Sequence, residues 1–504
     1  MKRALISVYD KTGVVPFAKE LQRLGFDIIS TGGTSRVLEE AGLTVKSVES
    51  ITGFPEIFEG RVKTLHPLVH GGLLGKRNSP VHQEEASKNK IDWIDLLVVN
   101  LYPFYETMTR PGATREQIIE NIDIGGPAMI RSAAKNHAFV TVVVSPKDYP
   151  AVLEELNRLG ETTLSTRTRL AQTAFSLTAE YDTWISGYFQ EEKFPETLPL
   201  VATRQEILRY GENPHQSGAF YRFRGDSPYS LASARQRHGK QLSYNNIQDA
   251  NAALQMLREF DRPTVVAVKH MNPCGIASAS TLDEAWRKAY QADPVSIFGG
   301  IVACNQPPTE GMAKAMAEMF LEMILAPSFP EPVLAILKKK KNVRLMEFVP
   351  GTEAIGMQIT SVQGGFLIQD GDHSLIETLS FPTKVRPTEE ELEQLLFAYK
   401  VVKHVKSNAI VIGRDFMTIG VGAGQMNRVG AAKIALEQAA DRAKGAVMAS
   451  DGFFPMNDTV TLAWRHGINA IIQPGGSIKD QESVDVCDEH GMAMVFAGIR
   501  HFKH

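Results

Sequence analysis

The sequence predicts an α/β protein made of two domains. Its 504 residues exceed what one hydrophobic core usually organises, so we expect at least two domains. Short apolar runs alternate with stretches of helical periodicity along most of the chain, which is typical of a sheet covered by helices. A charged, proline-containing run at 190–199, QEEKFPETLP, interrupts this alternation and is interpreted as a linker. We therefore expect one domain over 1–192 and a second over 200–504.

The first domain alternates strands and helices. Apolar runs predict strands at ALISV, FDIIS, LLVVN and FVTVVV. Between the first two strands, apolar residues recur at helical spacing and predict an amphipathic helix. These residues are Val14, Phe17, Ala18, Leu21 and Leu24. The order of elements predicts a Rossmann-like parallel sheet.

The second domain restarts the α/β pattern on a larger scale. Strands are predicted at TVVAVKH, IFGGIVAC, AIVIG, IGVGAG, AVMAS, AIIQPG and AMVFAG. Helical stretches are predicted over 388–402, 427–443 and 479–490. The lysine tract 338–341 is interpreted as the solvated end of a helix, with phosphate binding as the alternative. We see no internal sequence repeat.

Composition excludes several classes of function. A net charge of -3 gives no bulk attraction for nucleic acid or an anionic membrane. No run reaches the roughly 18 apolar residues of a membrane span, and the basic N-terminus leads directly into a strand without the apolar core of a signal peptide. Cys274, Cys304 and Cys487 lie far apart, which argues against a structural zinc site and for a reducing compartment. We expect a cytoplasmic protein that binds neither nucleic acid nor membranes and holds no metal.

A loop of small residues after the second strand is suited to phosphate. In the run STGGTS at 30–35, flexible residues allow backbone N–H groups to converge on an anion at a helix N-terminus. The alternative is a plain strand-to-helix turn with Thr34 or Ser35 as N-cap. The run RVKTLHP at 61–67 adds two cations, a hydroxyl and an imidazole, for which surface solvation is the alternative.

Two further stretches place polar groups at the ends of elements. Asn100 and Tyr102 follow LLVVN, where the carboxyl end of a parallel strand presents residues to a ligand. A strand-ending turn with a buried tyrosine is the alternative. Asp123 lies at the predicted start of a helix and Lys135 at its end, where capping and dipole pairing would explain both structurally. Because the four polar stretches occur together, they favour a functional site over four unrelated structural turns.

These strings resemble the inosine monophosphate (IMP) cyclohydrolase family, which has a methylglyoxal-synthase-like fold, over nearly the whole first domain. That family closes a formylated aminoimidazole carboxamide ribonucleotide, FAICAR, to IMP, and the intramolecular reaction needs mainly orientation and proton transfer. The resemblance implies that Tyr102, Asp123 and Lys135 surround the reacting groups. It makes Lys135 the proton donor and acceptor, and Lys63 a stabiliser of the departing oxygen. The residues that it places along the nucleotide are Lys11, Thr31, Gly32, Gly33, Thr34, Arg61, Thr64 and Asn100. The family commonly has serine where this chain has Tyr9.

A lysine and a histidine end the first TVVAV strand of the second domain. Lys269 and His270 are adjacent, so on an extended strand their side chains point to opposite faces. Both can reach one ligand only if the chain turns there, and we expect Asn272-Pro273 to supply the turn. An ordinary hydrogen-bonded histidine is the alternative for His270.

From about residue 204 to the end, the chain resembles the aminoimidazole carboxamide ribonucleotide (AICAR) transformylase family. That family has a duplicated cytidine-deaminase-like α/β fold, no catalytic zinc, and 10-formyltetrahydrofolate as co-substrate. The run around Cys274 agrees, because it lacks the second cysteine of a deaminase zinc site. The resemblance implies that His270 is the general base on the AICAR amine and that Lys269 steadies charge on the formyl group. The resemblance also implies which residues contact the nucleotide or the folate. They are Arg209, Tyr210, Phe298, Gly299, Asn408, Arg428, Phe453, Asp458 and Arg500. The resemblance leaves contacts at Glu322 and Met456 open, and it implies a homodimer.

Two features of the sequence suggest rival functions. Gly420, Gly422 and Gly424 suggest a nicotinamide-dependent oxidoreductase, but they alternate instead of following GxGxxG, and no acidic residue ends a second strand about 20 residues on. A nucleotide-sensing regulatory module built on the first domain is opposed by the full-length second domain with its Lys269-His270 pair. We therefore expect a bifunctional enzyme that formylates AICAR to FAICAR and then closes FAICAR to IMP.

Overall fold

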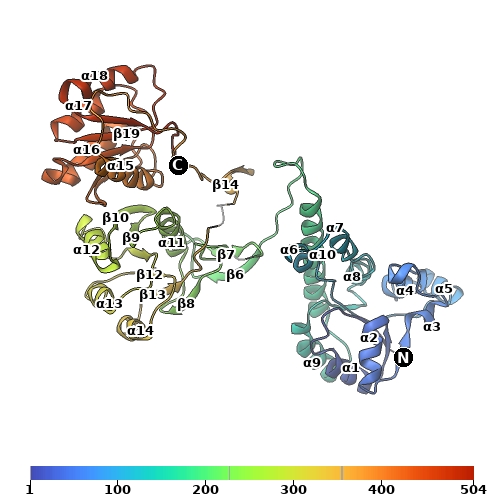
Figure 1. Ribbon diagram of the computed structural model, residues 1–504. Helices are drawn as coiled ribbons and strands as arrows, with labels where there is room; N and C mark the ends of the chain where they lie inside the picture. The colour runs from blue at the N-terminus through green and yellow to red at the C-terminus, as the bar shows by residue number, and fades with distance from the viewer. Residues whose placement is uncertain (1, 226, 353–355) are drawn as a thin grey trace. The chain divides into compact units, whose positions relative to one another are not determined.

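The chain folds into two compact units, Met1–Val201 and Ala202–His504. The computed structural model, drawn in Figure 1, describes residues 2–225, 227–352 and 356–504. Residues 190–202, which include the expected linker, form no helix or strand. Among the described residues, no helix combines the length and the apolar character that a bilayer span requires.

Unit 1 is built around a five-stranded sheet with the order β3-β2-β1-β4-β5. The strands are β1 Lys2–Ser7, β2 Phe26–Ser30, β3 Val45–Ser47, β4 Leu96–Val99 and β5 Thr141–Val143. All four pairings are parallel, which confirms the predicted parallel sheet. The chain order reverses between β1 and β4, and sheets of this kind bind ligands outside the carboxyl ends of the strands at such a reversal.

Helices of unit 1 cover this sheet with their apolar sides. In α1, Val14, Phe17, Ala18 and Leu21 are buried as predicted, whereas Leu24 follows the helix end and is half-buried. The helices of unit 1 are α1 Val14–Arg23, α2 Gly32–Glu40, α3 Val48–Thr52, α4 Pro67–Leu74, α5 Pro80–Lys88, α6 Phe104–Thr109, α7 Arg115–Glu120, α8 Gly125–Lys135, α9 Tyr149–Leu159 and α10 Leu164–Phe189.

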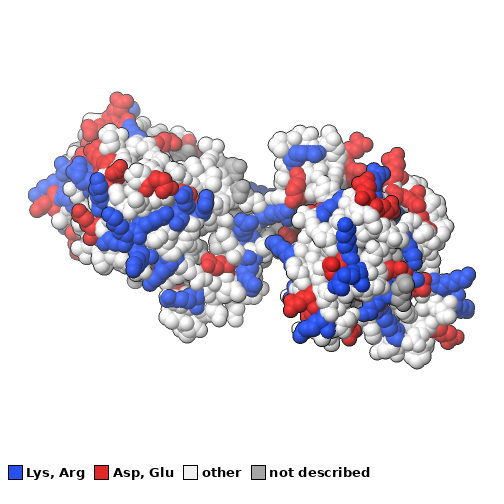
Figure 2. Space-filling model, turned by 90° about the horizontal axis from the view of Figure 1, so that it is seen from below, with Lys and Arg blue, Asp and Glu red and all other residues white. Residues whose placement is uncertain are grey.

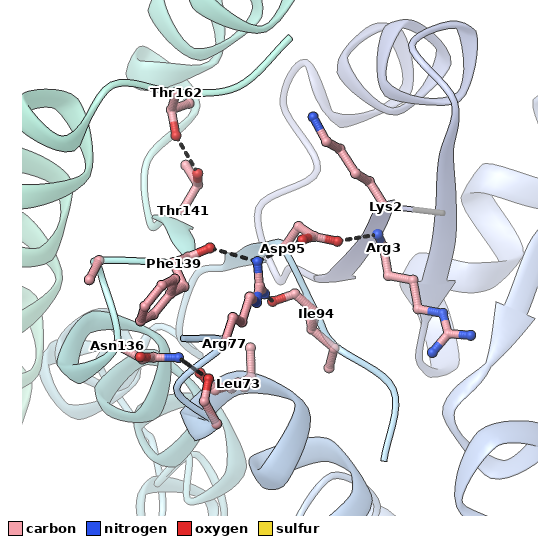
Figure 3. Close-up of polar contacts among 12 residues, drawn as sticks. Lys2, Arg3, Leu73, Arg77, Ile94, Asp95, Asn136, Phe139, Thr141 and Thr162 are labelled. Carbon is pink, nitrogen blue, oxygen red and sulfur yellow. Dashed lines mark hydrogen bonds and ion pairs between the residues drawn. The ribbon is translucent and has the colours of Figure 1, made fainter. Parts of the chain in front are cut away.

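An arginine between α4 and α5 ties the amino ends of three neighbouring strands together. As Figure 3 shows, the Arg77 guanidinium donates to the Asp95 carboxylate at 2.8 Å and to the carbonyls of Phe139 at 3.0 Å and Ile94 at 2.8 Å. The other oxygen of Asp95 accepts from the Arg3 N–H in β1 at 2.8 Å. This network lies at the edge of the sheet opposite to the carboxyl ends, so it supports the fold and leaves the ligand edge free.

Replacing Arg77 with methionine is expected to lower the free energy of unfolding by on the order of 3 kcal/mol, because Asp95 loses its partner in a partly buried site. Thermal unfolding followed by circular dichroism measures the effect. Arg23→Met is the control, because Arg23 makes an exposed i,i+3 pair with Glu20 and is expected to cost under about 0.5 kcal/mol. Equal shifts in Tm for the two variants would contradict the structural role of Arg77.

Unit 2 is built around an 11-stranded sheet with the order β20-β19-β18-β16-β17-β10-β9-β11-β12-β13-β8. Its strands are β8 Arg235–His238, β9 Thr264–Lys269, β10 Asn272–Ser278, β11 Ile301–Cys304, β12 Met323–Ala326, β13 Arg344–Glu347, β16 Ile410–Arg414, β17 Met417–Gly422, β18 Val447–Ser450, β19 Ala470–Gln473 and β20 Ala493–Phe496. Two hairpins lie outside the sheet: β6 Thr203–Leu208 with β7 Gly218–Arg222, and β14 Gln358–Val362 with β15 Gly365–Gln369.

Unit 2 contains a structural repeat that the sequence does not reveal. In each half, a helix precedes a β-hairpin, and three parallel strands separated by helices then extend the sheet beyond the first strand of the hairpin. The second strands of the two hairpins, β10 and β17, pair antiparallel in the middle of the sheet, at Ala277 and Met417. The duplicated α/β architecture is therefore confirmed. The helices are α11 Tyr244–Leu257, α12 Leu282–Ala292, α13 Glu310–Ala317 and α14 Glu331–Leu337 in one half, and α15 Glu389–Val402, α16 Arg428–Ala439, α17 Asp458–Arg465 and α18 Asp480–His490 in the other.

The alternating glycines of β17 are explained by packing. A Cβ on Gly420 would meet the carbonyl oxygen of Ala435, and a Cβ on Gly422 would meet that of Ala431, both in α16. Gly275 stands in the same relation to Ala289 of α12 in the other half. These glycines allow a helix to lie directly on the hairpin, so they do not indicate a dinucleotide site.

Candidate active sites

The small-residue loop of unit 1 lies at the carboxyl edge of the sheet, next to the reversal. Thr31 precedes α2 in extended conformation, and its hydroxyl hydrogen-bonds that of Ser7 at the end of β1, at 2.9 Å. Gly32 and Gly33 form the first turn of α2, and no atom lies within 4 Å of where their Cβ atoms would be. Backbone N–H groups at a helix N-terminus have no acceptor within the helix. An anion can therefore approach this turn closely.

The alternative N-caps are wrong, because α2 already begins at Gly32 and no side chain caps it. Thr34 is buried in the first turn, where its hydroxyl accepts from the Val8 N–H at 3.1 Å and donates to the Val8 carbonyl at 3.0 Å. The Thr34 hydroxyl therefore ties α2 to the loop after β1 and is not free to contact a nucleotide.

Asn100 organises the neighbouring loop. Its side-chain oxygen accepts from the N–H groups of Tyr9 at 2.6 Å and Asp10 at 2.9 Å, and its amide donates to the Asp10 carbonyl at 2.9 Å. Lys11 is exposed in that loop. The ring of Tyr9 meets that of Tyr102 edge-on, with centroids 5.9 Å apart. The structure thus brings Lys11 and Tyr102 to the carboxyl edge, with Asn100 holding the loop between them.

A second cluster gathers at the N-terminus of α8. The Asp123 carboxylate accepts from the Gly126 N–H at 2.7 Å, and the Thr64 hydroxyl lies 2.6 Å from where a Cβ on Gly125 would be. Burial raises the pKa of Asp123 above its ordinary value, although the N–H groups of Gly126 and Tyr102 and the charge of Lys63 oppose the rise. A carboxyl group with a raised pKa is suited to exchanging protons.

Two predicted residues of the first site have long, charged side chains at the protein surface. Arg61 is exposed and pairs with Glu120 at the end of α7. Lys135 is exposed and is the last residue of α8, so the rise of the helix places its backbone about 15 Å from that of Gly125. The structure therefore does not bring Lys135 to Asp123 within one chain.

In unit 2, the predicted turn at Asn272-Pro273 is wrong, because both residues belong to β10. Lys269 pairs with Asn272 across the hairpin, and the turn consists of His270 and Met271. Their φ angles are 53° and 62°, and two-residue hairpin turns of type I′ require positive φ at both positions. Sequence reasoning missed this turn because histidine and methionine seldom adopt positive φ.

The hairpin turn lies beside Phe298 and Gly299. Lys269 Nζ donates to the Phe298 carbonyl at 2.9 Å, and the Phe298 ring packs against that of Phe320 with centroids 5.7 Å apart. Gly299 has a φ of 72°, and its N–H donates to the Phe320 carbonyl at 2.8 Å. Four of the predicted residues are thus assembled in one place. Glu322 is close in the chain, but its carboxylate pairs with Arg344 at 2.6 Å.

Asn408 and Arg428 meet around a buried aspartate of the other half. Arg428 donates to the Asn408 side-chain oxygen at 2.8 Å and forms an ion pair with Asp451, which is fully buried. Asp451 neutralises the guanidinium, so Arg428 orients Asn408 and offers no free charge to a ligand. The Lys406 N–H donates to Asn272 Oδ1 at 3.3 Å and joins this cluster to the lysine–histidine hairpin.

The remaining predicted residues of this half lie near Arg428 or at the start of α17. Gly452 lies against both Arg428 and Phe502, and the Arg500 guanidinium stacks over the Phe502 ring at 4.6 Å. Phe453 follows Gly452 and is partly exposed, whereas Asp458 begins α17 and accepts from the Thr459 N–H at 2.7 Å.

Arg209 and Tyr210 lie in the loop between β6 and β7, where the guanidinium stacks over the Tyr210 ring at 5.0 Å. That loop contacts the start of α11, since Asn245 donates to the Glu212 carbonyl at 3.3 Å. Figure 2 shows that Lys and Arg side chains gather over part of the visible face of unit 2, on the left of that view. Local positive charge is thus present although the chain as a whole is slightly acidic.

Comparison with known proteins identifies the family. The model of the family described as AICARFT/IMPCHase bienzyme matches residues 133–438, and that of the MGS-like domain matches 13–128. The chain belongs to the AICARFT/IMPCHase bienzyme family. The bifunctional purine biosynthesis proteins PurH of Anoxybacillus flavithermus and Listeria monocytogenes are 56% and 55% identical to it, each over 100% of both chains. A solved structure described as "Crystal structure of ForH" matches 38% of this chain and 99% of its own at 35% identity, with a TM-score of 0.34.

The family assignment confirms the predicted folds and activities. The N-terminal unit is an MGS-like domain, and the chain is a bifunctional enzyme of purine biosynthesis that combines AICAR formyltransferase and IMP cyclohydrolase activities. Formyl transfer in this family is folate-dependent. The side chains available for it at the hairpin do not include a thiolate, because burial raises the pKa of Cys274 to about 12. Within the three described ranges, no group of three His, Cys, Asp or Glu side chains is placed to hold a metal ion.

In unit 1 of this bienzyme, sequence reasoning missed Tyr181. This residue of α10 is buried, and its hydroxyl accepts from the Asp123 N–H at 2.9 Å and donates to the Asn121 carbonyl at 2.9 Å. Burial raises its pKa to about 12, so the hydroxyl keeps its proton and can donate. Tyr181 therefore holds the segment that carries Asp123. Helical periodicity marks it only as a core residue, and no local signal reports a contact 58 positions away.

Proposed function

We propose that the two activities reside in separate units and act in sequence on one purine precursor. Unit 2 transfers a formyl group from 10-formyltetrahydrofolate to AICAR, giving FAICAR and tetrahydrofolate. Unit 1 closes FAICAR to IMP with loss of water. The observation that carries this division is that the lysine–histidine hairpin and the Asp123 cluster belong to different compact units.

In formyl transfer, the AICAR amine is conjugated with its imidazole ring and is a poor nucleophile. His270 accepts a proton from this amine as the new bond from nitrogen to the formyl carbon forms, and that proton goes to N10 of folate as the bond from N10 to carbon breaks. Lys269, oriented by the Phe298 carbonyl, stabilises the negative charge that develops on the formyl oxygen. The exposed guanidinium groups of Arg209 and Arg500 are suited to bidentate contact with phosphate.

In ring closure, the carboxamide nitrogen attacks the formyl carbon of the same molecule, and the formyl oxygen leaves as water. The effective concentration is already high, so the protein supplies orientation and proton transfer. Asp123 takes a proton from the attacking nitrogen and returns it to the oxygen, a second proton from the formamide nitrogen completes the departing water, and Lys63 stabilises charge on that oxygen. The open first turn of α2, with Gly32 and Gly33, binds the phosphate.

Incubation with AICAR and 10-formyltetrahydrofolate tests the proposed sequence of reactions. FAICAR is expected to appear first and IMP to follow, both measured by chromatography. Absence of both products in a folded preparation would contradict the proposal. We also place the enzyme in the cytoplasm, because its three cysteines are all free and two of them are buried.

We further propose that the enzyme is a homodimer in which Lys135 serves the ring-closure site of a second copy. The resemblance places Lys135 at the reacting groups, yet in its own chain it lies one helix length from Asp123. Both statements hold if the exposed end of α8 reaches into a neighbouring copy.

Mixing Asp123→Asn and Lys135→Ala chains tests this shared site. Each variant alone is expected to lose ring closure while formyl transfer continues and FAICAR accumulates. After unfolding and refolding together, half of the dimers are mixed, and one of their two sites carries both native residues, so about a quarter of the wild-type ring-closure rate is expected to return. If both residues serve one chain's own site, every site keeps one lesion and no activity returns.

A further inference from the structure

Asp249 of α11 holds the backbone of the lysine–histidine turn. Its two carboxylate oxygens accept from the two consecutive N–H groups of the turn: Oδ2 from His270 at 3.2 Å and Oδ1 from Met271 at 2.7 Å. Asp249 is half-buried on a helix that packs against β9. One side chain therefore holds the N–H groups of both turn residues, His270 and Met271, which have positive φ.

The turn needs such a partner because its conformation is costly. The left-handed region costs a residue other than glycine about 1 kcal/mol or more, and two such residues occur here in succession. Hydrogen bonds to a charged acceptor are stronger than those to a neutral one, so a carboxylate offsets this cost well. Without the turn, Lys269 and His270 would point to opposite faces of an extended strand.

The structural repeat provides an internal comparison. In the other half of unit 2, the turn between β16 and β17 consists of Asp415 and Phe416, whose φ angles are 51° and 55°. Gln394 of α15 accepts from the Asp415 N–H through Oε1 at 3.0 Å. The helper residue precedes the turn by 21 positions in both halves, since 270 − 249 and 415 − 394 are equal. The half that lacks the lysine–histidine pair uses one neutral acceptor, whereas the half that carries the pair uses a carboxylate for both N–H groups.

We infer that Asp249 is a positioning residue for formyl transfer: by binding both N–H groups of the turn, it holds Lys269 and His270 where both side chains reach the same substrate. The inference rests on the role proposed for His270. Asp249 acts through the backbone and does not itself touch the substrate.

The paired variants Asp249→Ala and Gln394→Ala test this role, because each removes the acceptor of an equivalent turn. Asp249→Ala is expected to lower kcat for formyl transfer by about 10²-fold, since small displacements of catalytic groups have effects of that size, with KM for AICAR within about threefold. Gln394→Ala is expected to stay within about threefold in both constants. Ring closure of supplied FAICAR should be unchanged in both. If Asp249→Ala loses no more kcat than Gln394→Ala, the inference is wrong.

Rescue by glycine separates positioning from general destabilisation. Glycine adopts positive φ without penalty. Adding Met271→Gly to Asp249→Ala is therefore expected to raise kcat about tenfold above that of Asp249→Ala alone, while Met271→Gly alone stays near wild type. No recovery would overturn the role in holding the turn. If Asp249→Ala does not fold, Asp249→Gln replaces it, because the other half folds with a glutamine, Gln394, at the equivalent position. Asp249→Gln is expected to lower kcat about tenfold. A His270→Ala enzyme that still formylates would instead refute the proposed role of His270.

Discussion

His270→Ala is expected to reduce formyl transfer by about 10²- to 10⁴-fold and to leave ring closure of supplied FAICAR unchanged. The AICAR amine needs a positioned base, and no second imidazole stands in the lysine–histidine turn. The ring-closure cluster lies in the other compact unit, so it does not depend on this side chain. Tetrahydrofolate release measures the first activity, and IMP formation from FAICAR measures the second.

The matched control for His270→Ala is Asp415→Ala, which changes the first residue of the equivalent turn in the other half. It is expected to keep formyl transfer within about threefold, since it alters the same local geometry without the imidazole. Formyl transfer retained by His270→Ala would remove this residue from the mechanism. Loss of both activities together would show instead that the two sites are not independent.

Asp123→Asn is expected to lower ring closure by about 10²-fold or more while formyl transfer continues. Asparagine keeps an oxygen that can accept from the Gly126 N–H, so the start of α8 is preserved and only proton exchange is lost. Burial raises the pKa of Asp123. The wild-type rate should therefore fall as the pH drops through that raised pKa, whereas the residual rate of Asp123→Asn should lack this dependence.

The same pKa predicts the effect of Asp123→Asn on stability. A carboxyl group whose pKa is raised on folding stabilises the protein below its unfolded pKa, and this contribution is lost as the pH rises through the folded pKa. At neutral pH the variant should thus be no less stable than the wild type. Asp27→Asn is the control: it changes a carboxylate of β2 that pairs with Lys46 of β3, and it should keep ring closure. Ring closure by Asp123→Asn within threefold of wild type would exclude Asp123 as the proton carrier.

Local patterns predicted the elements well because periodicity reports which face of a helix or strand is buried. The apolar spacing in α1, the strands predicted from apolar runs and the helices near 388–402 and 479–490 are found in the structure, whereas β3, β8, β10, β12 and β13 were not predicted. The glycine-containing turn before α2 was located for the same reason, since flexible residues between a strand and a helix are a local signal. Local patterns do not predict the turn at His270 and Met271, because its two residues adopt positive φ, which they seldom do.

The sequence by itself determined the α/β class, the division into two domains and the polar stretches that supply the candidate side chains. Only the tertiary structure decided which of these side chains meet, and which residues hold them. Asp249, Tyr181 and Asp451 act on partners brought near by packing, so no spacing along the chain reports them. The repeat of unit 2 is also visible only in three dimensions, because a fold constrains burial and backbone geometry, as at Gly275 and Gly420, far more than residue identity.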